Sequence, residues 1–105
     1  MEDVKLSLDE KGHGAFTIQV DGEQWGEMVV SRSGTYLTVY HTEVSPKAEG
    51  KGLAKELLAA MVDYARKNAL KVIPLCPYVH AQFKRHPKLY ADVWESGFAQ
   101  EEKSS

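Results

Sequence analysis

The apolar residues of this chain change their spacing once, near residue 45. Before that point they alternate with polar residues, which is the period of a β-strand with one buried face. Glycine-containing turn signals interrupt the alternation at residues 9–14, 21–22 and 31–34. The predicted strands are Val4–Leu8, residues 16–20, residues 25–30 and Tyr36–Val44. Successive strands joined by short turns predict an antiparallel meander.

After Gly52 the apolar residues follow the period of a helix instead. Over residues 52–68 they recur at spacings of three and four, and neither proline nor glycine interrupts the interior. The apolar face consists of Ala54, Leu57, Leu58, Met61, Val62 and Ala65. The pattern therefore predicts one long amphipathic helix.

The remaining segment predicts one short strand and shorter helices. We expect a strand at residues 71–75, with its ladder pairing interrupted at Pro74. A helix is expected over residues 78–85 with Pro77 at its start, and Pro87 should end or kink it before a last short helix at 88–94. This order of elements predicts an α/β (α+β) fold.

Length and composition indicate one folded unit. The chain has 105 residues, 43% of them hydrophobic, which is enough to form one core, and it contains no repeat, linker or low-complexity block. We expect a single domain over residues 1–105 with a core at about residues 4–98. The polar tail, residues 99–105, is expected to be disordered.

Charge and cysteine usage exclude several classes of function. The net charge of −2 and the pI of about 6.1 argue against a nucleic-acid-binding domain, which usually carries a basic excess. The single cysteine, Cys76, allows neither an internal disulfide nor a cysteine-rich zinc site. His13, His80 and His86 lack the spacing of metal ligands, so we interpret them as surface or loop residues and expect no metal.

The same features predict where the protein resides. The first five residues contain no apolar signal core, and no apolar run is long enough to cross a membrane. Together with the lone cysteine, this predicts a cytoplasmic protein with no membrane partner.

The loop of residues 46–52 joins the end of a predicted strand to the start of the long helix. Gly50 and Gly52 allow the chain to bend and a ligand to come close, while Lys47 and Lys51 add positive charge. Unpaired N–H groups at a helix N-terminus favour a phosphate or pyrophosphate there. The alternative is an ordinary glycine-rich turn.

Two other phosphate-binding motifs fail at defined positions. A P-loop needs Ser or Thr after its Gly-Lys pair, but Gly52 follows Lys51. A dinucleotide fingerprint needs a third glycine where this chain has Lys55.

Residues 43–54 resemble the cofactor loop of the GNAT superfamily of N-acetyltransferases. The family motif is Gln or Arg, two variable residues, Gly, one variable residue, and Gly or Ala. Gly50 and Gly52 match it, and Lys47 stands where Gln or Arg is usual. With residues 41–44 and 76–79, the chain resembles more closely a small single-domain YjdJ-like branch that carries a characteristic cysteine. The resemblance extends from about Leu8 to Val93.

The resemblance implies a GNAT-like mixed sheet and acetyl-CoA as cosubstrate. Its implied cofactor-binding residues are Val44, Lys47, Ala48, Glu49, Gly50, Lys51, Gly52 and Leu53. Backbone groups at residues 42–44 would pair with the pantetheine and face the acyl carbonyl. It also implies direct attack on the thioester by a primary amine, from an unidentified small molecule or protein. We expect a monomer or weak dimer.

Four side chains are candidate catalytic groups. His41 and Glu43 are two residues apart on a strand and so share a face, where they would accept a proton or form an ordinary polar pair. Cys76 has three interpretations: a covalent nucleophile, a wall of the pocket beside the sulfur, or a buried small hydrophobe.

A general acid is harder to place. Tyr78 and Tyr90 are candidates for protonating the leaving thiolate, whereas the family's usual tyrosine position falls on Phe83 or Lys84. Each tyrosine could equally be a packing residue.

Two further interpretations of function remain open. The chain could be a CoA-binding regulatory module without turnover, or a protein-interaction module on the same scaffold. A basic cluster of Lys84, Arg85, His86 and Lys88 could meet CoA phosphates or an acidic substrate, or simply be a solvated helix face.

Overall fold

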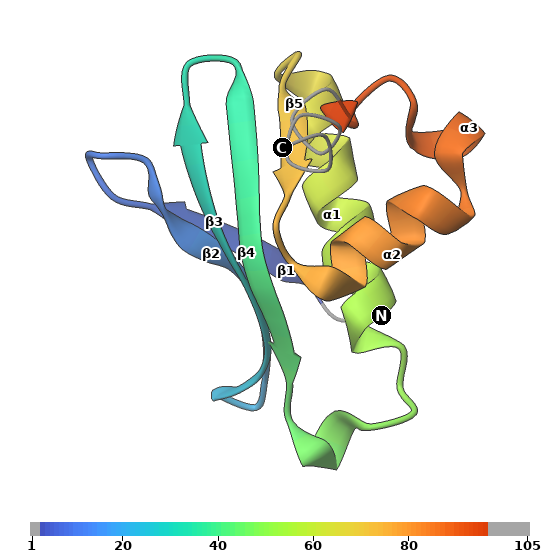
Figure 1. The fold of residues 1–105 in the computed structure, drawn as a ribbon. Coiled ribbons are helices and arrows are strands. Elements are labelled where there is room, and N and C mark those ends of the chain that lie inside the picture. The colour runs from blue at the N-terminus through green and yellow to red at the C-terminus, as the bar shows by residue number, and fades with distance from the viewer. Residues whose placement is uncertain (1–2, 97–105) are drawn as a thin grey trace.

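The computed structural model describes residues 3–96 (Figure 1). The strands are β1 (Val4–Leu8), β2 (His13–Val20), β3 (Glu23–Ser33), β4 (Tyr36–Val44) and β5 (Lys71–Pro74). The helices are the 3₁₀ turn η1 (Pro46–Ala48), α1 (Leu53–Lys67), α2 (Pro77–Arg85) and α3 (Pro87–Tyr90).

The strands form one mixed sheet in the order β1-β2-β3-β4-β5. The first four pair antiparallel with their neighbours in sequence, and β5 pairs parallel to β4. The crossover from β4 to β5 carries α1, as a parallel connection requires. The α/β fold with an antiparallel meander and a mixed sheet is therefore confirmed.

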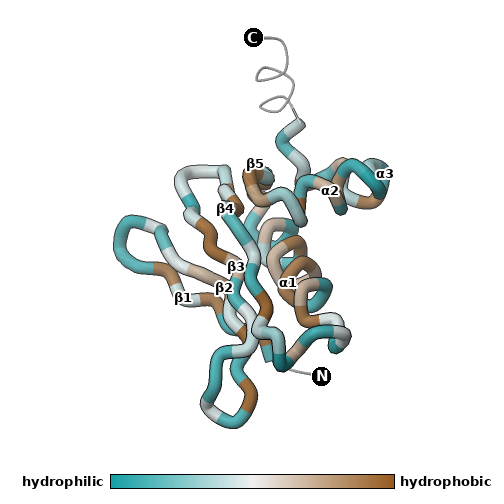
Figure 2. The backbone as a smooth tube through the Cα atoms, turned by 60° about the horizontal axis from the view of Figure 1, so that its bottom comes forward, coloured by the Kyte–Doolittle hydropathy of each residue, from teal (hydrophilic) through white to brown (hydrophobic). Residues whose placement is uncertain are grey.

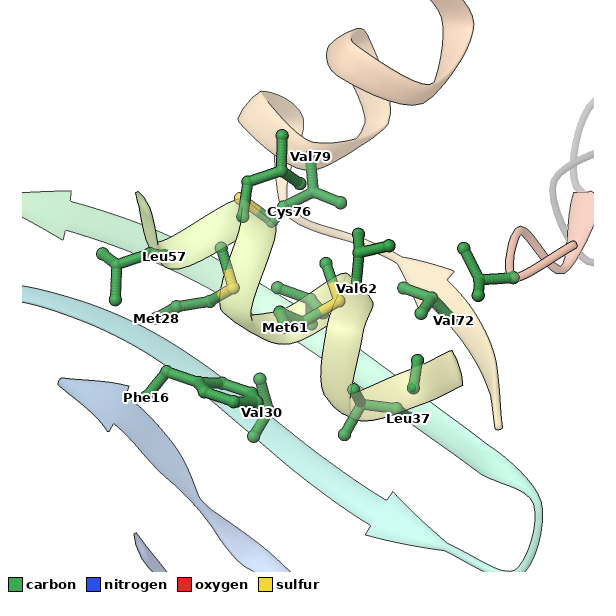
Figure 3. Close-up of a cluster of buried hydrophobic side chains, with 14 of the residues drawn as sticks. Phe16, Met28, Val30, Leu37, Leu57, Met61, Val62, Val72, Cys76 and Val79 are labelled. Carbon is green, nitrogen blue, oxygen red and sulfur yellow. The ribbon is translucent and has the colours of Figure 1, made fainter. Parts of the chain in front are cut away.

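Helices α1 and α2 cover one side of the sheet, and α3 lies on the same side, next to α2 (Figures 1 and 2). Helix α1 packs across β1 to β4, and α2 packs on β4 and β5. Between the layers lies the core, in which Leu57, Met61 and Met28 are fully buried (Figure 3). Burial of each such side chain stabilises the fold by about 1.5–3 kcal/mol. The apolar face of α1 therefore contributes much of the free energy that holds the helix layer on the sheet.

The predicted helix at residues 52–68 is confirmed, with Gly52 and Asn68 as its caps. One predicted face residue differs, because Ala54 is half-buried while Leu53 is in the core. The helix at Pro77–Arg85 is also confirmed, and Pro77 occupies its first turn.

Four strand boundaries predicted from the sequence were wrong. Strand β3 begins at Glu23 rather than at residue 25. Strand β2 begins at His13 and includes Gly14, whose position beneath the Ser7 carbonyl leaves no room for a Cβ atom. Strand β3 extends to Ser33, because its backbone keeps pairing with β4 after the apolar alternation stops. Strand β5 ends at Pro74 rather than at residue 75.

The last predicted helix is also shorter than expected. Helix α3 covers only Pro87–Tyr90, and Trp94 instead forms a parallel bridge with Val72. The Val72 N–H donates to the Val93 carbonyl at 2.6 Å, and the Glu95 N–H donates to the Val72 carbonyl at 2.9 Å. Backbone pairing to β5 thus overrides helix propensity in this segment.

Two sequence expectations fall partly or wholly outside the described residues: the core limit at residue 98 and the tail at 99–105. Over residues 3–96, no helix combines the length and apolar character needed to span a membrane.

Candidate cosubstrate site at the end of β4

The second half of β4 separates from β5. The β4–β5 register ends at the pair Val39–Pro74, and the Cys76 N–H makes one more bond to the Val39 carbonyl at 2.9 Å. On the other side, the β3–β4 register shifts after Val29, so that Tyr40 is an extra residue in β4. Such a bulge bends the strand and changes which edge its peptide groups face.

Beyond the bulge, the backbone of β4 presents an edge with no neighbouring strand. The Ser45 N–H donates to the Trp25 carbonyl at 2.8 Å. This bond shows which residues of β4 direct their peptide groups towards β3. Because antiparallel pairs alternate, the peptide groups of His41 and Glu43 face β3. Those of Thr42 and Val44 then face the opposite edge, where β5 has already ended.

The loop that follows β4 leads to the uncapped N-terminus of α1. Gly50 and Gly52 have φ angles of 82° and 74°, a conformation that favours glycine. No atom lies within 4 Å of the Cβ that either position lacks. The first-turn N–H groups of a helix have no intrahelical partner, and at Gly52 no side chain caps those of α1. The loop therefore presents donors and partial positive charge to open space.

Both loop lysines contact the start of β3. Lys47 Nζ lies 2.9 Å from Glu23 Oε2, and this hydrogen-bonded lysine holds the pKa of the Glu23 carboxyl below its usual value. Lys51 Nζ lies 6.0 Å from the centre of the Trp25 ring. A phosphate at the loop would therefore meet a Lys47 that already has a carboxylate partner.

His41 and Glu43 form a pair, as their strand spacing predicts. His41 Nε2 lies 3.2 Å from Glu43 Oε1, and both side chains are largely exposed. The register of β3 brings a third group beside them, Glu27, which sits opposite Glu43. Ligand atoms of the three residues lie within 4.8 Å of one another. The set could share a divalent cation or a proton.

Glu27 was missed from the sequence because only the strand register places it here. Its own spacing in β3 shows which face it occupies but not which residue of β4 it meets. Within residues 3–96 its carboxylate has no hydrogen-bond or ion-pair partner. A pocket of about 240 Å³ adjoins it, bordered by Trp25, Glu43 and Val44 among others.

Cys76 lies on the other face of β4 from the His41–Glu43 pair. It is 2% exposed, belongs to the core, and is the residue before α2 (Figure 3). Its Sγ lies 3.4 Å from Thr42 Oγ1. Since side chains alternate along a strand, the contact with Thr42 directs His41 and Glu43 to the uncovered face of the sheet. His41 therefore is not an activating neighbour of the thiol.

Tyr78 follows in the first turn of α2. Its hydroxyl is buried without a hydrogen-bond partner in the described part of the chain. Burial, with smaller effects of Tyr90 and Cys76, raises the pKa of Tyr78 above its usual value. At the family's usual tyrosine position, Phe83 is fully buried and stacks on Tyr90 with ring centres 4.7 Å apart.

The three remaining histidines are only partly as expected. His13 and His86 are exposed, as expected, although His13 lies in β2 rather than in a loop. His80 is half-buried on α2, with its ring 6.1 Å from that of Trp94. The interpretation as a surface or loop residue is therefore wrong for His80.

The comparisons with known proteins agree on one family of enzymes. Residues 15–93 match the family model for GCN5-related N-acetyl-transferases. Over 96 residues the chain is 34% identical to mycothiol acetyltransferase of Renibacterium salmoninarum. The aligned region covers 90% of this chain but only 25% of that protein.

The solved structures agree with the sequence matches. A GCN5-like N-acetyltransferase from Staphylococcus aureus, described as putative, superposes with a TM-score of 0.64 at 27% identity and covers 90% of each chain. The fold also matches N-acetylglutamate synthase from Neisseria gonorrhoeae, solved with coenzyme A and N-acetyl-glutamate, with a TM-score of 0.50 at 22% identity, over 57% of this chain and 15% of that one. The chain belongs to the family of GCN5-related N-acetyltransferases.

Proposed function

We propose that the chain transfers an acetyl group from acetyl-CoA to a primary amine by direct attack. The observation that carries this proposal is the free edge of β4 at Thr42 and Val44, which leads straight into the uncapped N-terminus of α1. An extended amide chain can pair with a strand edge, and a pyrophosphate can bind at a helix N-terminus. The two features are adjacent in sequence and suit the two parts of one ligand.

The residues that would hold acetyl-CoA follow from this geometry. Thr42 and Val44 would pair with its pantetheine amides. The pyrophosphate would meet the backbone between Ala48 and Leu53, including the glycines at 50 and 52, with Glu49 turned to solvent. Lys51 and Lys47 would contribute charge, the latter only by sharing or leaving Glu23.

Acetyl-CoA supplies an activated acyl group as a thioester. In the proposed reaction the amine nitrogen bonds to the carbonyl carbon, the carbon–sulfur bond breaks, and the amine loses a proton. The His41 imidazole, held by Glu43, accepts that proton directly or through water. Glu27 and Glu43 favour a cationic amine on the same face before it loses its proton.

The departing sulfur does not require full protonation by Tyr78. A thiol has a pKa of about 8.5 and an unperturbed tyrosine about 10, so transfer from tyrosine to thiolate is uphill. The raised pKa of Tyr78 makes this proton transfer still more unfavourable. Tyr78 is better suited to donating a hydrogen bond that stabilises the thiolate charge.

One observation favours the second candidate, a CoA-binding regulatory module without turnover. Lys47 stands at the position where the family motif has Gln or Arg, and it is paired with Glu23. A weakened pyrophosphate contact would suit a sensor better than an enzyme.

Turnover separates the two candidates. Release of free CoA thiol from acetyl-CoA should be measured with small primary amines and lysine-containing peptides, for the native chain and for His41→Ala. We expect amine-dependent release that falls in the variant by about 10²-fold, since general bases typically contribute 10²–10⁴. Saturable acetyl-CoA binding with no amine-dependent release would instead support the regulatory module.

A further inference from the structure

A second pocket lies between α1 and the α2–α3 segment, away from the free edge of β4. It has a volume of about 320 Å³. Its lining includes Lys55 and Leu58 of α1, Arg85 and His86 at the end of α2, and Leu89 and Tyr90 of α3. Its wall thus combines two fixed cations and an imidazole with an aliphatic and aromatic surface.

The charged groups of this pocket have no protein partners. Lys55, Arg85 and His86 are exposed, and within residues 3–96 their side chains make no ion pair or hydrogen bond. By contrast, Arg66 is paired with Asp92 and Lys67 with Asp63. No Asp or Glu lines the pocket. The positive potential of the pocket is therefore uncompensated, which favours an anion.

The apolar side of the pocket is also exposed to solvent. Leu89 is 56% exposed, the highest value among the large hydrophobic residues described. Tyr90 stacks on the buried Phe83 and is thereby fixed in place. A flat ring placed between Leu58, Leu89 and Tyr90 would cover this surface.

The pocket lies within reach of the glycine loop. Lys55 is three residues after Gly52, a rise of about 4.5 Å along the helix axis. On α2, Tyr78, Gln82 and Arg85 share a face by their helical spacing. That row runs from Tyr78, which is proposed to stabilise the departing sulfur, to Arg85 at the pocket.

We propose that this pocket binds the 3′-phosphoadenosine end of CoA. Arg85 and Lys55 would hold the 3′-phosphate, and Leu58, Leu89 and Tyr90 would contact the adenine. The 3′-phosphate is a monoester carrying close to two negative charges, and Arg and Lys side chains both bind phosphate groups through charge-assisted hydrogen bonds. Only a ribose separates it from the pyrophosphate, which matches the short step from the loop to Lys55. This inference rests on the proposed use of acetyl-CoA.

Dephospho-CoA, which lacks only the 3′-phosphate, tests the proposal. Affinities of CoA and dephospho-CoA should be measured by calorimetry for the native chain, Arg85→Gln and Lys55→Gln. We expect the native chain to bind CoA about tenfold more tightly. In each variant CoA binding should weaken while dephospho-CoA binding stays unchanged, so that the ratio falls towards one. Lys88→Gln removes a cation of the same basic cluster that does not line the pocket, and it should keep the native ratio.

The outcomes distinguish this inference from the proposed function. Equal native affinities for both ligands, or a ratio that survives in both pocket variants, would overturn the inference and leave acetyl-CoA binding intact. A ratio lost equally in Lys88→Gln would also overturn it, because general surface charge would then account for the effect. If neither ligand binds, the proposed function fails and this inference fails with it.

Discussion

At the scale of single residues, the position of Cys76 bears most on the mechanism. Its thiol is buried in the core and contacts the Thr42 hydroxyl, while His41 lies on the opposite face of β4. A thiol becomes a strong nucleophile when a neighbouring cation or base favours the thiolate. Thr42 is neither a cation nor a base. We therefore expect Cys76 to line the pocket beside the acyl group or to act as a packing residue, and not to form a covalent intermediate.

Replacing Cys76 by Ser tests this view. The serine hydroxyl can keep the contact with Thr42, so we expect the fold to persist with a loss of stability on the order of 1 kcal/mol. Amine-dependent release of CoA should remain measurable. Intact-mass spectrometry of the native protein after incubation with acetyl-CoA alone should show no adduct. A stoichiometric acetyl group on Cys76 that added amine removes would establish a covalent route.

The Lys47–Glu23 pair predicts opposite effects of two substitutions on acetyl-CoA affinity. Glu23→Gln removes the competing carboxylate and should tighten binding by roughly two- to fivefold, the range of an exposed ion pair. Lys47→Gln should weaken binding by a similar factor and reduce its dependence on salt. Calorimetry at two salt concentrations measures both. Identical affinities in all three proteins would show that the loop backbone alone recognises the phosphates.

At the scale of elements, the connection from β4 to α1 forms the proposed cosubstrate site, and a matched pair of substitutions tests it. Gly52 and Gly34 both have positive φ and open space around the missing Cβ, but Gly34 lies in the β3–β4 turn. Valine at either position should cost about 1–2 kcal/mol of stability through backbone strain. Only Gly52→Val should also weaken acetyl-CoA binding, by roughly tenfold or more. Equal affinities in the two folded variants would remove the loop from the site.

A second prediction at this scale concerns the ion pair between Arg66 of α1 and Asp92 in the segment after α3. Arg66 Nε donates to Asp92 Oδ2 at 2.8 Å, which holds the pKa of Asp92 below its usual value. The pair therefore stabilises the folded state above the unfolded pKa of about 3.9, and this contribution disappears as pH falls through the lower folded value.

Asp92→Asn should remove that part of the pH dependence. Thermal unfolding between pH 6 and pH 3 should show a smaller fall in melting temperature for the variant than for the native chain. Asp63→Asn, which breaks the exposed pair with Lys67, serves as the control. An unchanged slope in Asp92→Asn, or the same change in the control, would contradict this role.

The elements show what the sequence could and could not predict. Helix α1 was predictable because one burial period runs through it. Strand β4 was predictable because it is rich in β-branched and aromatic residues, although the bulge at Tyr40 shifts its burial alternation. The extension of β3 and the bridge at Trp94 were not, because both depend on backbone pairing with residues distant in sequence. The same limit applies to the site. The loop glycines are local signals, whereas the neighbour of Glu43 across the ladder, Glu27, follows from a register that composition does not encode.

At the scale of the whole molecule, the helices on one side leave the other face of the sheet open (Figure 1). Cys76 and Thr42 meet on the helix side, and Glu27, His41 and Glu43 lie on the uncovered side. The free edge of β4 lies between these two environments. The architecture thus allows a cosubstrate to approach along the helices and an amine to approach from the open face, as direct attack requires.

The most direct test of this account is a titration of the ¹⁵N-labelled protein with acetyl-CoA, followed by amide chemical shifts. We predict saturable shifts concentrated at Thr42, Val44 and the loop to Leu53, at Cys76 and Tyr78, and at Lys55 and Arg85. The amides of β1 and of the β3–β4 turn at Gly34 should stay unperturbed. Shifts absent at saturating acetyl-CoA, or confined to residues away from β4 and the glycine loop, would contradict the assignment of the cosubstrate site.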